Sequence, residues 1–245
     1  MSYDFVYLDK LFMLDDAFIE DTSGLISQSM GTEVVAPFLY NLIMFERPRK
    51  ILEIGAGYTS MYILKALFDC DSLIKEEKNN ITSNNLINPN YFNNIRPAKL
   101  HIIDNCAHQK TTANKVFKKA QDMGFEGLLK FHEGDFFNFA DKLPKEDLPF
   151  DLIWLDCGNL TYYEHFKKFY FPLVNKNGGL ILIHSLQTNF HGQMFLKNLK
   201  LEQATTHFNK YELISILEPH KLRQNSLTIL RSVENLRTNI HSVQA

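Results

Sequence analysis

Cysteine is scarce in this sequence, and the few present do not pair. The 245 residues include three, Cys70, Cys106 and Cys157, with no C-x-x-C spacing among them. This distribution argues against a disulfide framework and against a zinc site built from thiolates. A chain without disulfides suits a reducing compartment, so we expect a cytoplasmic protein.

An excess of charge of either sign is also missing. The 26 Lys and Arg residues nearly balance the 28 Asp and Glu residues, whereas nucleic-acid-binding proteins usually present a basic surface. No segment has about 18 consecutive apolar residues. The first ten residues, MSYDFVYLDK, carry two aspartates where a signal peptide has a basic leader. We therefore expect no nucleic-acid partner, no membrane span and no signal peptide.

Short apolar runs that alternate with helical patterns fill the chain after Lys50. This alternation is typical of a parallel sheet with helices on both faces. The expected parallel strands are 50–54, 99–103, 129–132, 150–155 and 179–184, and the runs 211–217 and 226–231 are expected to form an antiparallel hairpin. The predicted fold class is α/β, with a seven-stranded, mostly parallel sheet closed by a C-terminal antiparallel hairpin.

The residues before this sheet form a predicted N-terminal helical appendage, a cap or lid spanning 1–48. Apolar residues at helical spacing predict one helix over 5–18 and a second over 33–45. The Ser-, Thr- and Gly-rich stretch 21–32 between them is expected to be a loop that covers a ligand.

The sheet domain itself is expected to span 49–233, followed by a tail over 234–245. Within it, the Asn-rich stretch 71–97 is expected to be a long polar insertion. The charged run KEEK in this stretch contains Glu76 and Glu77, which are predicted to be solvated.

A glycine turn is the strongest single feature. The strand 51–54 runs into Gly55-Ala56-Gly57, and a helix is predicted from Tyr58 to about Phe68. Such a turn lets backbone N–H groups and a helix N-terminus approach a bound nucleotide. The third glycine of the dinucleotide fingerprint is replaced, and strand-to-helix turns also use glycine for steric reasons alone.

Acidic side chains stand where the expected strands end. Asp104 ends the second strand, and a carboxylate there can accept both hydrogen bonds of a ribose diol. Asp135 and Phe136 follow the third strand and suit an adenine amino group and ring, although Asp135 has an N-cap role as its alternative. Asp156 ends the fourth strand, and Glu53 precedes the glycine turn. Because parallel strands end at one edge, these groups are expected to line one site.

Taken in order, these motifs resemble those of class I S-adenosylmethionine-dependent methyltransferases. LEIGAGYTS is similar to the first motif, HIIDN to the second, EGDFF to the third, and FDLIWLDCGN with GGLILIHS to the fourth and fifth. MGTEVVAPFLYNLIMFERPRKILEIGAG more narrowly resembles the small O-methyltransferases of the catechol and caffeoyl-coenzyme A type. The resemblance implies a Rossmann-like fold and bound S-adenosyl-L-methionine. The cofactor-side residues are then Glu53, Gly55, Gly57, Asp104, Asp135 and Asp156. Two further candidate cofactor contacts are Phe136 and, beside the glycine turn, Tyr58.

The sequence departs from the metal-dependent members of that family at one place. Those members bind a divalent cation through an Asp after the fourth strand and an Asp-Asn pair after the fifth. Asp156 matches the first position, but His184 and Ser185 replace the pair. Because a magnesium site here loses its second carboxylate, we expect no catalytic metal, although Asp156 and His184 suit a softer ion.

The candidates for catalysis follow the fourth and fifth strands. Alignment of an acceptor with a sulfonium methyl group contributes about 7 to 11 kcal/mol, and a general base typically adds 10² to 10⁴-fold. His184 is the candidate base, because imidazole accepts protons near neutral pH. Its alternative is a histidine that fills the core edge. Asn159 and Tyr162 are expected to contact the acceptor.

Three functions remain open at this stage. The first is methyl transfer to oxygen or nitrogen of a small-molecule substrate. The second is a cyclase or lyase that consumes the same cofactor and releases methylthioadenosine, as in azetidine-2-carboxylate formation. The third is a non-catalytic cofactor-binding subunit. A homodimer is compatible with each.

Overall fold

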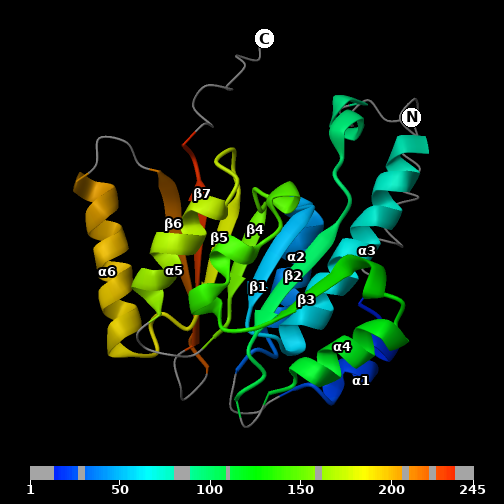
Figure 1. Cartoon of the computed structure of the whole chain (residues 1–245), viewed down its shortest axis with the longest axis horizontal. Helices are drawn as coiled ribbons and strands as arrows, with labels where there is room; N and C mark the ends of the chain where they lie inside the picture. Colours follow the sequence, from blue (N-terminus) through cyan, green and yellow to red (C-terminus); the bar gives the residue numbers. More distant parts are fainter. Residues whose placement is uncertain are drawn as a thin grey trace.

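The computed structural model describes residues 14–26, 31–79, 89–108, 111–157, 162–205, 210–220 and 225–234. Its helices are α1 (Asp16–Ser23), α2 (Val35–Glu46), α3 (Tyr58–Asn79), α4 (Ala113–Asp122), α5 (Tyr163–Tyr170) and α6 (Phe190–Thr205). Its strands are β1 (Lys50–Ile54), β2 (Lys99–Asp104), β3 (Leu129–Glu133), β4 (Leu152–Leu155), β5 (Leu180–His184), β6 (Tyr211–Glu218) and β7 (Asn225–Ser232). Figure 1 shows their arrangement.

The seven strands form one sheet in the order β3-β2-β1-β4-β5-β7-β6. Strands β1 to β5 are parallel to one another, and β7 lies antiparallel to both β5 and β6. This confirms the predicted Rossmann-like sheet with its C-terminal hairpin. The chain leaves β1 toward β2 and later returns to its other side as β4. The carboxyl ends of β1 and β4 therefore flank a switch point, where open α/β sheets bind ligands.

Helices cover both faces of the sheet, as predicted (Figure 1). All five residues of β1 are buried, as expected for a strand covered on two sides. Ile51 belongs to the core cluster on the side of α2 and α3. Its neighbour Leu52 belongs to the cluster on the side of α5 and α6. None of the described helices is long and apolar enough to cross a bilayer.

Only the end of the first predicted helix, over 5–18, falls among the described residues. Residues before 14 lie outside the described part of the chain, and α1 starts at Asp16. The Asp15 side chain caps it by accepting a hydrogen bond of 2.7 Å from the backbone N–H of Phe18. The helix continues to Ser23, so the first three residues of the predicted loop over 21–32 are helical. Phe18 packs edge to face on Tyr62 of α3, with ring centroids 5.0 Å apart.

The predicted polar insertion is wrong in its first part. α3 does not end near Phe68 but runs through Asn79 and buries Leu73. Residues 80–88 lie outside the described part of the chain. Glu77 is not a solvated charge, since its carboxylate receives hydrogen bonds of 2.5 and 2.7 Å from the guanidinium of Arg47. A contact across 30 residues therefore extends the helix where the local composition is polar.

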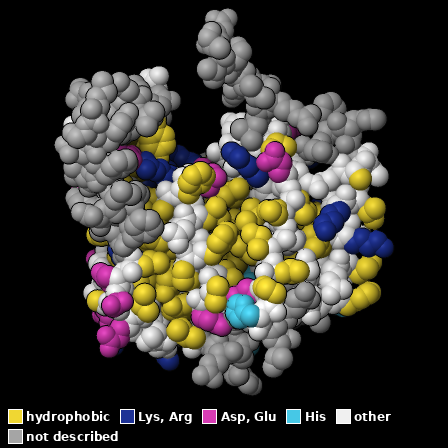
Figure 2. Space-filling view, turned by 180° about the vertical axis from the view of Figure 1, so that it is seen from behind, with side chains coloured by type: hydrophobic (Ala, Val, Ile, Leu, Met, Phe, Trp, Pro, Cys, Tyr) yellow, Lys and Arg dark blue, Asp and Glu magenta, His cyan; other side chains and the backbone are white. Residues whose placement is uncertain are grey.

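Hydrophobic side chains gather across the back of the molecule (Figure 2). On α2, Val34 at the N-cap, Phe38 and Phe45 are exposed, and Phe45 keeps 83% of its surface accessible. Their spacing places them on the side of α2 that faces away from the sheet. Apolar surfaces of this kind often contact a partner, and the expected homodimer stays a prediction.

Candidate functional site

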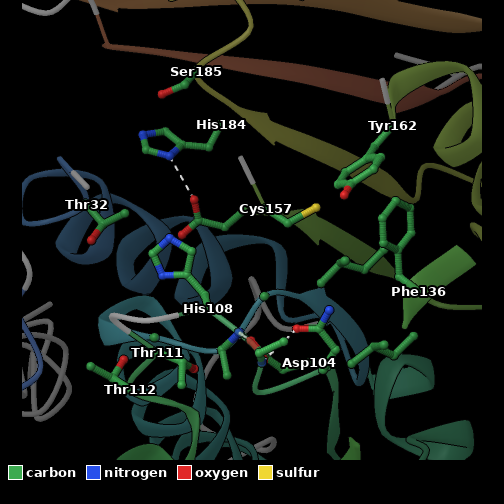
Figure 3. A pocket seen from close by; sticks show the side chains of 18 of the residues that line it. Thr32, Asp104, His108, Thr111, Thr112, Phe136, Cys157, Tyr162, His184 and Ser185 are labelled. Atoms are coloured by element: carbon green, nitrogen blue, oxygen red, sulfur yellow. Dashed lines mark hydrogen bonds and ion pairs between the residues drawn. The ribbon is translucent and has the colours of Figure 1, made fainter. Parts of the chain in front are cut away.

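A cavity of about 590 Å³ opens at the carboxyl ends of the parallel strands. Its size is typical of small-molecule sites. Figure 3 shows side chains from several elements converging on it. Nine predicted residues line this cavity: Gly55, Gly57, Tyr58, Asp104, Asp135, Phe136, Asp156, Tyr162 and His184. Asn159 lies outside the described residues.

The glycine turn between β1 and α3 is pressed against the end of β4. Gly55 has a φ of 97°, a conformation that L side chains rarely adopt. A Cβ at Gly55 would stand 2.6 Å from the carbonyl oxygen of Asp156. Both observations restrict this position to glycine, so the turn requires the residue that the sequence provides.

Asp104 is held at the edge of this turn. Its Oδ2 accepts a hydrogen bond of 2.8 Å from the backbone N–H of Ala56, and its Oδ1 accepts one of 2.7 Å from that of Cys106. Each carboxylate oxygen has a second lone pair for another donor. The two backbone bonds therefore orient the carboxylate without using up its capacity to bind a ligand.

Glu53 does not line the cavity but lies beneath the turn. It is fully buried, and its Oε1 accepts a hydrogen bond of 2.9 Å from the Thr59 hydroxyl. Burial raises the pKa of Glu53 to about 8, helped by the nearby carboxylates of Asp156 and Asp104 and opposed by the hydroxyls of Ser60 and Thr59. The side chain thus supports the turn mainly in its protonated form at neutral pH. Its role in cofactor binding stays a prediction.

Asp156 and His184 are joined across neighbouring strands. Nδ1 of His184 lies 2.8 Å from Oδ1 of Asp156 (Figure 3), and the two side chains are 6% and 15% exposed. The imidazole also packs against Trp154, with ring centroids 5.8 Å apart. Trp154 is fully buried. The histidine is therefore held on one side by packing and on another by a carboxylate.

Aromatic residues form the wall beyond the end of β3. Phe136 and Tyr162 meet edge to face with ring centroids 5.0 Å apart. Asp135 accepts a hydrogen bond of 3.0 Å from the Phe137 N–H and caps the short 3-10 helix Phe136–Asn138. The capping role considered for Asp135 is thus confirmed, and the same side chain also borders the cavity.

Sequence reasoning missed several lining residues that have no motif. They are His108, Thr111, Thr112, Thr188, Asn189 and Asn225. Asn225 is the first residue of β7 and donates a hydrogen bond of 2.7 Å to the carbonyl oxygen of Gly31. Its Oδ1 accepts one of 3.3 Å from the Ser185 hydroxyl. The strand order that brings Asn225 here cannot be read from a local pattern.

The charge of the cavity lining determines which ligands the cavity favours. The described lining residues include Asp104, Asp135 and Asp156 but no Lys or Arg. Such a lining favours a ligand with a cationic group over a ligand with an anionic group. Burial raises the pKa of the lining thiol of Cys157 to about 12, so this thiol stays uncharged at neutral pH. Within the described part of the chain, no three His, Cys, Asp or Glu side chains are grouped to hold a metal ion.

Comparisons with known proteins bear on the fold. No family model matches the sequence, and no curated protein is significantly similar to it. Among solved structures, the chain is similar to the O-methyltransferase TomG of Streptomyces achromogenes in complex with SAM, at 16% identity and a TM-score of 0.61 over 89% of this chain and 90% of that one. It is also similar to an O-methyltransferase of Bacillus cereus in complex with SAH, at 13% identity and a TM-score of 0.61 over 92% and 95%.

A third similar structure is the MycE methyltransferase of the mycinamycin pathway with Mg, SAH and mycinamycin VI, at 16% identity and a TM-score of 0.52. The match covers 89% of this chain and 55% of MycE. At these identities the three likenesses establish the Rossmann-like methyltransferase fold.

Proposed function

We propose that this protein is an S-adenosyl-L-methionine-dependent methyltransferase that acts on an oxygen or nitrogen atom of a small molecule. The observation that carries the proposal is the hydrogen bond that joins Asp104 to the glycine turn at the switch point of the sheet. The bound cofactors of TomG and of the Bacillus cereus enzyme support it, because those proteins share this fold.

The lining residues fit each part of this cofactor. The glycine turn suits close approach of a ligand to the backbone, and Asp104 would accept hydrogen bonds from the ribose diol. Phe136 offers aromatic surface for the adenine ring. The aspartates of the cavity lining would favour the sulfonium and ammonium groups of the cofactor, which are both cationic.

In the proposed mechanism, the bound cofactor supplies a methyl group activated by its sulfonium. The cavity residues align the acceptor with that group, which is the main contribution to rate in an in-line displacement. Nε2 of His184 accepts the proton that the acceptor loses. Tyr162, which lines the same cavity, would contact the acceptor.

The proposal includes independence from a catalytic metal. MycE contains Mg, but here the position of the Asp-Asn pair holds His184 and Ser185, and His184 already engages Asp156 at 2.8 Å. A hard cation prefers several oxygen ligands. The arrangement supports proton transfer by imidazole in place of metal activation.

Mass spectrometry of the protein incubated with S-adenosylmethionine tests the proposal, first alone and then with a metabolite extract, each with and without EDTA. We expect S-adenosylhomocysteine only with the extract, and in equal amounts when EDTA is present. The added methyl mass would identify the acceptor. Methylthioadenosine formed from the cofactor alone would instead indicate a cyclase or lyase, and binding without turnover would indicate a non-catalytic subunit.

Substituting Asp104 is expected to weaken cofactor binding. Asp104→Asn removes the charge that strengthens hydrogen bonds to the ribose, so the Kd for S-adenosylmethionine should rise about 10 to 100-fold. Isothermal titration calorimetry measures this change. Asp122→Asn on exposed α4 is the matched control and should leave the Kd unchanged. An unchanged Kd in Asp104→Asn would remove this carboxylate from the site.

Loss of the His184 imidazole is expected to slow methyl transfer. His184→Gln should lower kcat about 10² to 10⁴-fold, because it removes the proton-accepting group. Cofactor Kd and the circular dichroism spectrum should stay the same. Steady-state kinetics with the acceptor from the extract give kcat, and an unaffected value would mean that His184 only fills the core edge.

A further inference from the structure

We propose that Asp156 is a positioning residue: its side chain holds His184 so that Nε2 faces the acceptor, and it binds neither the cofactor nor a metal. This inference rests on the proposed function for its catalytic consequence. The arrangement of the two side chains can be tested without turnover.

The backbone brings the two residues together. His184 ends β5, and Asp156 directly follows β4, whose Leu155 is the sheet partner of Ile183. The carbonyl oxygen of Asp156 lies against Gly55, where a Cβ would come within 2.6 Å. The main chain of Asp156 therefore abuts the glycine turn, while its side chain contacts His184.

The chemistry of the pair determines which ring nitrogen is free. An ionised carboxylate only accepts hydrogen bonds, so Nδ1 of His184 carries the hydrogen in the 2.8 Å contact with Asp156. The neutral imidazole then has its lone pair on Nε2. Nε2 is buried and has no hydrogen-bond partner among the described residues. A buried acceptor without a partner is costly, and a ligand donor in the adjoining cavity would satisfy it.

Packing restricts the ring from another side. Trp154 lies against the imidazole and donates a hydrogen bond of 3.4 Å to the Thr59 hydroxyl, which in turn donates to Glu53 beneath the glycine turn. The ring thus has a defined rotamer and a defined tautomer before any ligand binds. Such preorganisation is what a general base requires.

Nitrogen-15 NMR of protein labelled at its nine histidines tests the arrangement directly. The signal missing from His184→Gln assigns His184. In the wild type we expect the hydrogen on Nδ1, and in Asp156→Asn we expect it on Nε2, because the amide N–H can donate to Nδ1. A wild-type hydrogen on Nε2, or an unchanged spectrum in Asp156→Asn, would overturn the proposal whether or not the protein transfers methyl groups.

Kinetics then separate positioning from cofactor or metal binding. We expect Asp156→Asn to lower kcat at least 10-fold and to change the Kd for S-adenosylhomocysteine less than about 3-fold. The double variant Asp156→Asn, His184→Gln should have the same kcat as His184→Gln alone, because the two residues act as a unit. Asp156→Glu, which keeps a carboxylate, should recover part of kcat. A 10-fold rise in the Kd would instead make Asp156 a cofactor ligand. Wild-type activity that EDTA abolishes and Mg²⁺ restores would make it a metal ligand.

Discussion

Replacing Asp147 with asparagine is expected to lower the free energy of unfolding by about 3 to 5 kcal/mol, the usual cost of breaking a buried ion pair. Asp147 is 4% exposed and ends a short 3-10 helix over Lys145–Asp147. Its Oδ1 lies 2.5 Å from Nζ of Lys50, and its Oδ2 lies 2.7 Å from Nζ of Lys130 and 3.1 Å from Nε2 of His101.

The large effect follows from where the positive charges lie. The Lys50 side chain is 7% exposed, so without its carboxylate partner it would remain a buried cation. Lys130 is 37% exposed and can turn toward water. Burial lowers the pKa of His101 to about 4, despite the attraction of Asp147, so this ring is neutral at pH 7. The bonds from Lys130 and Lys50 outweigh burial and hold the pKa of Asp147 well below its usual range. The stabilisation is therefore fully present above about pH 4.

Urea denaturation at pH 7 measures the Asp147→Asn loss. Glu146→Ala, at the exposed preceding residue, is the control and should change stability by less than about 0.5 kcal/mol. Adding Lys50→Met removes the buried cation that has lost its partner. The free energy of unfolding of the double variant should therefore fall by less than the sum of the decreases in the two single variants. Additive losses would show that the Lys50 and Asp147 charges do not interact.

Replacing Glu53 with glutamine is expected to stabilise the cofactor-free protein most at alkaline pH. Folding raises the pKa of this carboxyl from 4.5 to about 8. The folded protein then binds the proton more tightly than the unfolded chain, so wild-type stability falls as the pH rises from 4.5 to 8. Glutamine cannot ionise. The free energy of unfolding of Glu53→Gln should exceed that of the wild type by about 4 kcal/mol at pH 8 and by under about 1 kcal/mol at pH 5.

Thermal and urea unfolding of both proteins between pH 5 and pH 8 check this dependence. Glu126→Gln, at an exposed site before β3, should leave the pH profile unchanged. A difference in the free energy of unfolding between Glu53→Gln and the wild type that does not vary with pH would mean that Glu53 is ionised in the folded protein. Destabilisation at pH 8 would mean that the carboxylate itself supports the turn.

The sheet could be predicted because its strands have a strong local signal. β1 has the predicted bounds, since its apolar run stands between Lys50 and Gly55. β4 begins two residues later than predicted, because Phe150 makes only an isolated bridge to Val174. The end of α3 was missed because Glu77 is neutralised by Arg47, the C-cap residue of α2, which lies 30 residues earlier in the sequence.

The candidate site could be predicted as a set but not as a geometry. Acids at strand ends meet because parallel strands finish at one edge, which brought Asp104 and Asp156 to the same cavity. The pairing of Asp156 with His184 depends on β4 lying next to β5, and the part played by Asn225 depends on β7 lying next to β5. Neither adjacency is contained in a local motif.

The hydrogen bond between Asn225 and Gly31 joins residues 194 positions apart. During synthesis, the cavity wall near Ser185 therefore stays incomplete until the final hairpin has left the ribosome. The glycine turn and Asp104 emerge more than 100 residues earlier than Asn225. A nascent chain can assemble the turn side of the cavity long before its opposite wall closes, so truncation before β7 would leave a half-built site on a sheet with an open β5 edge.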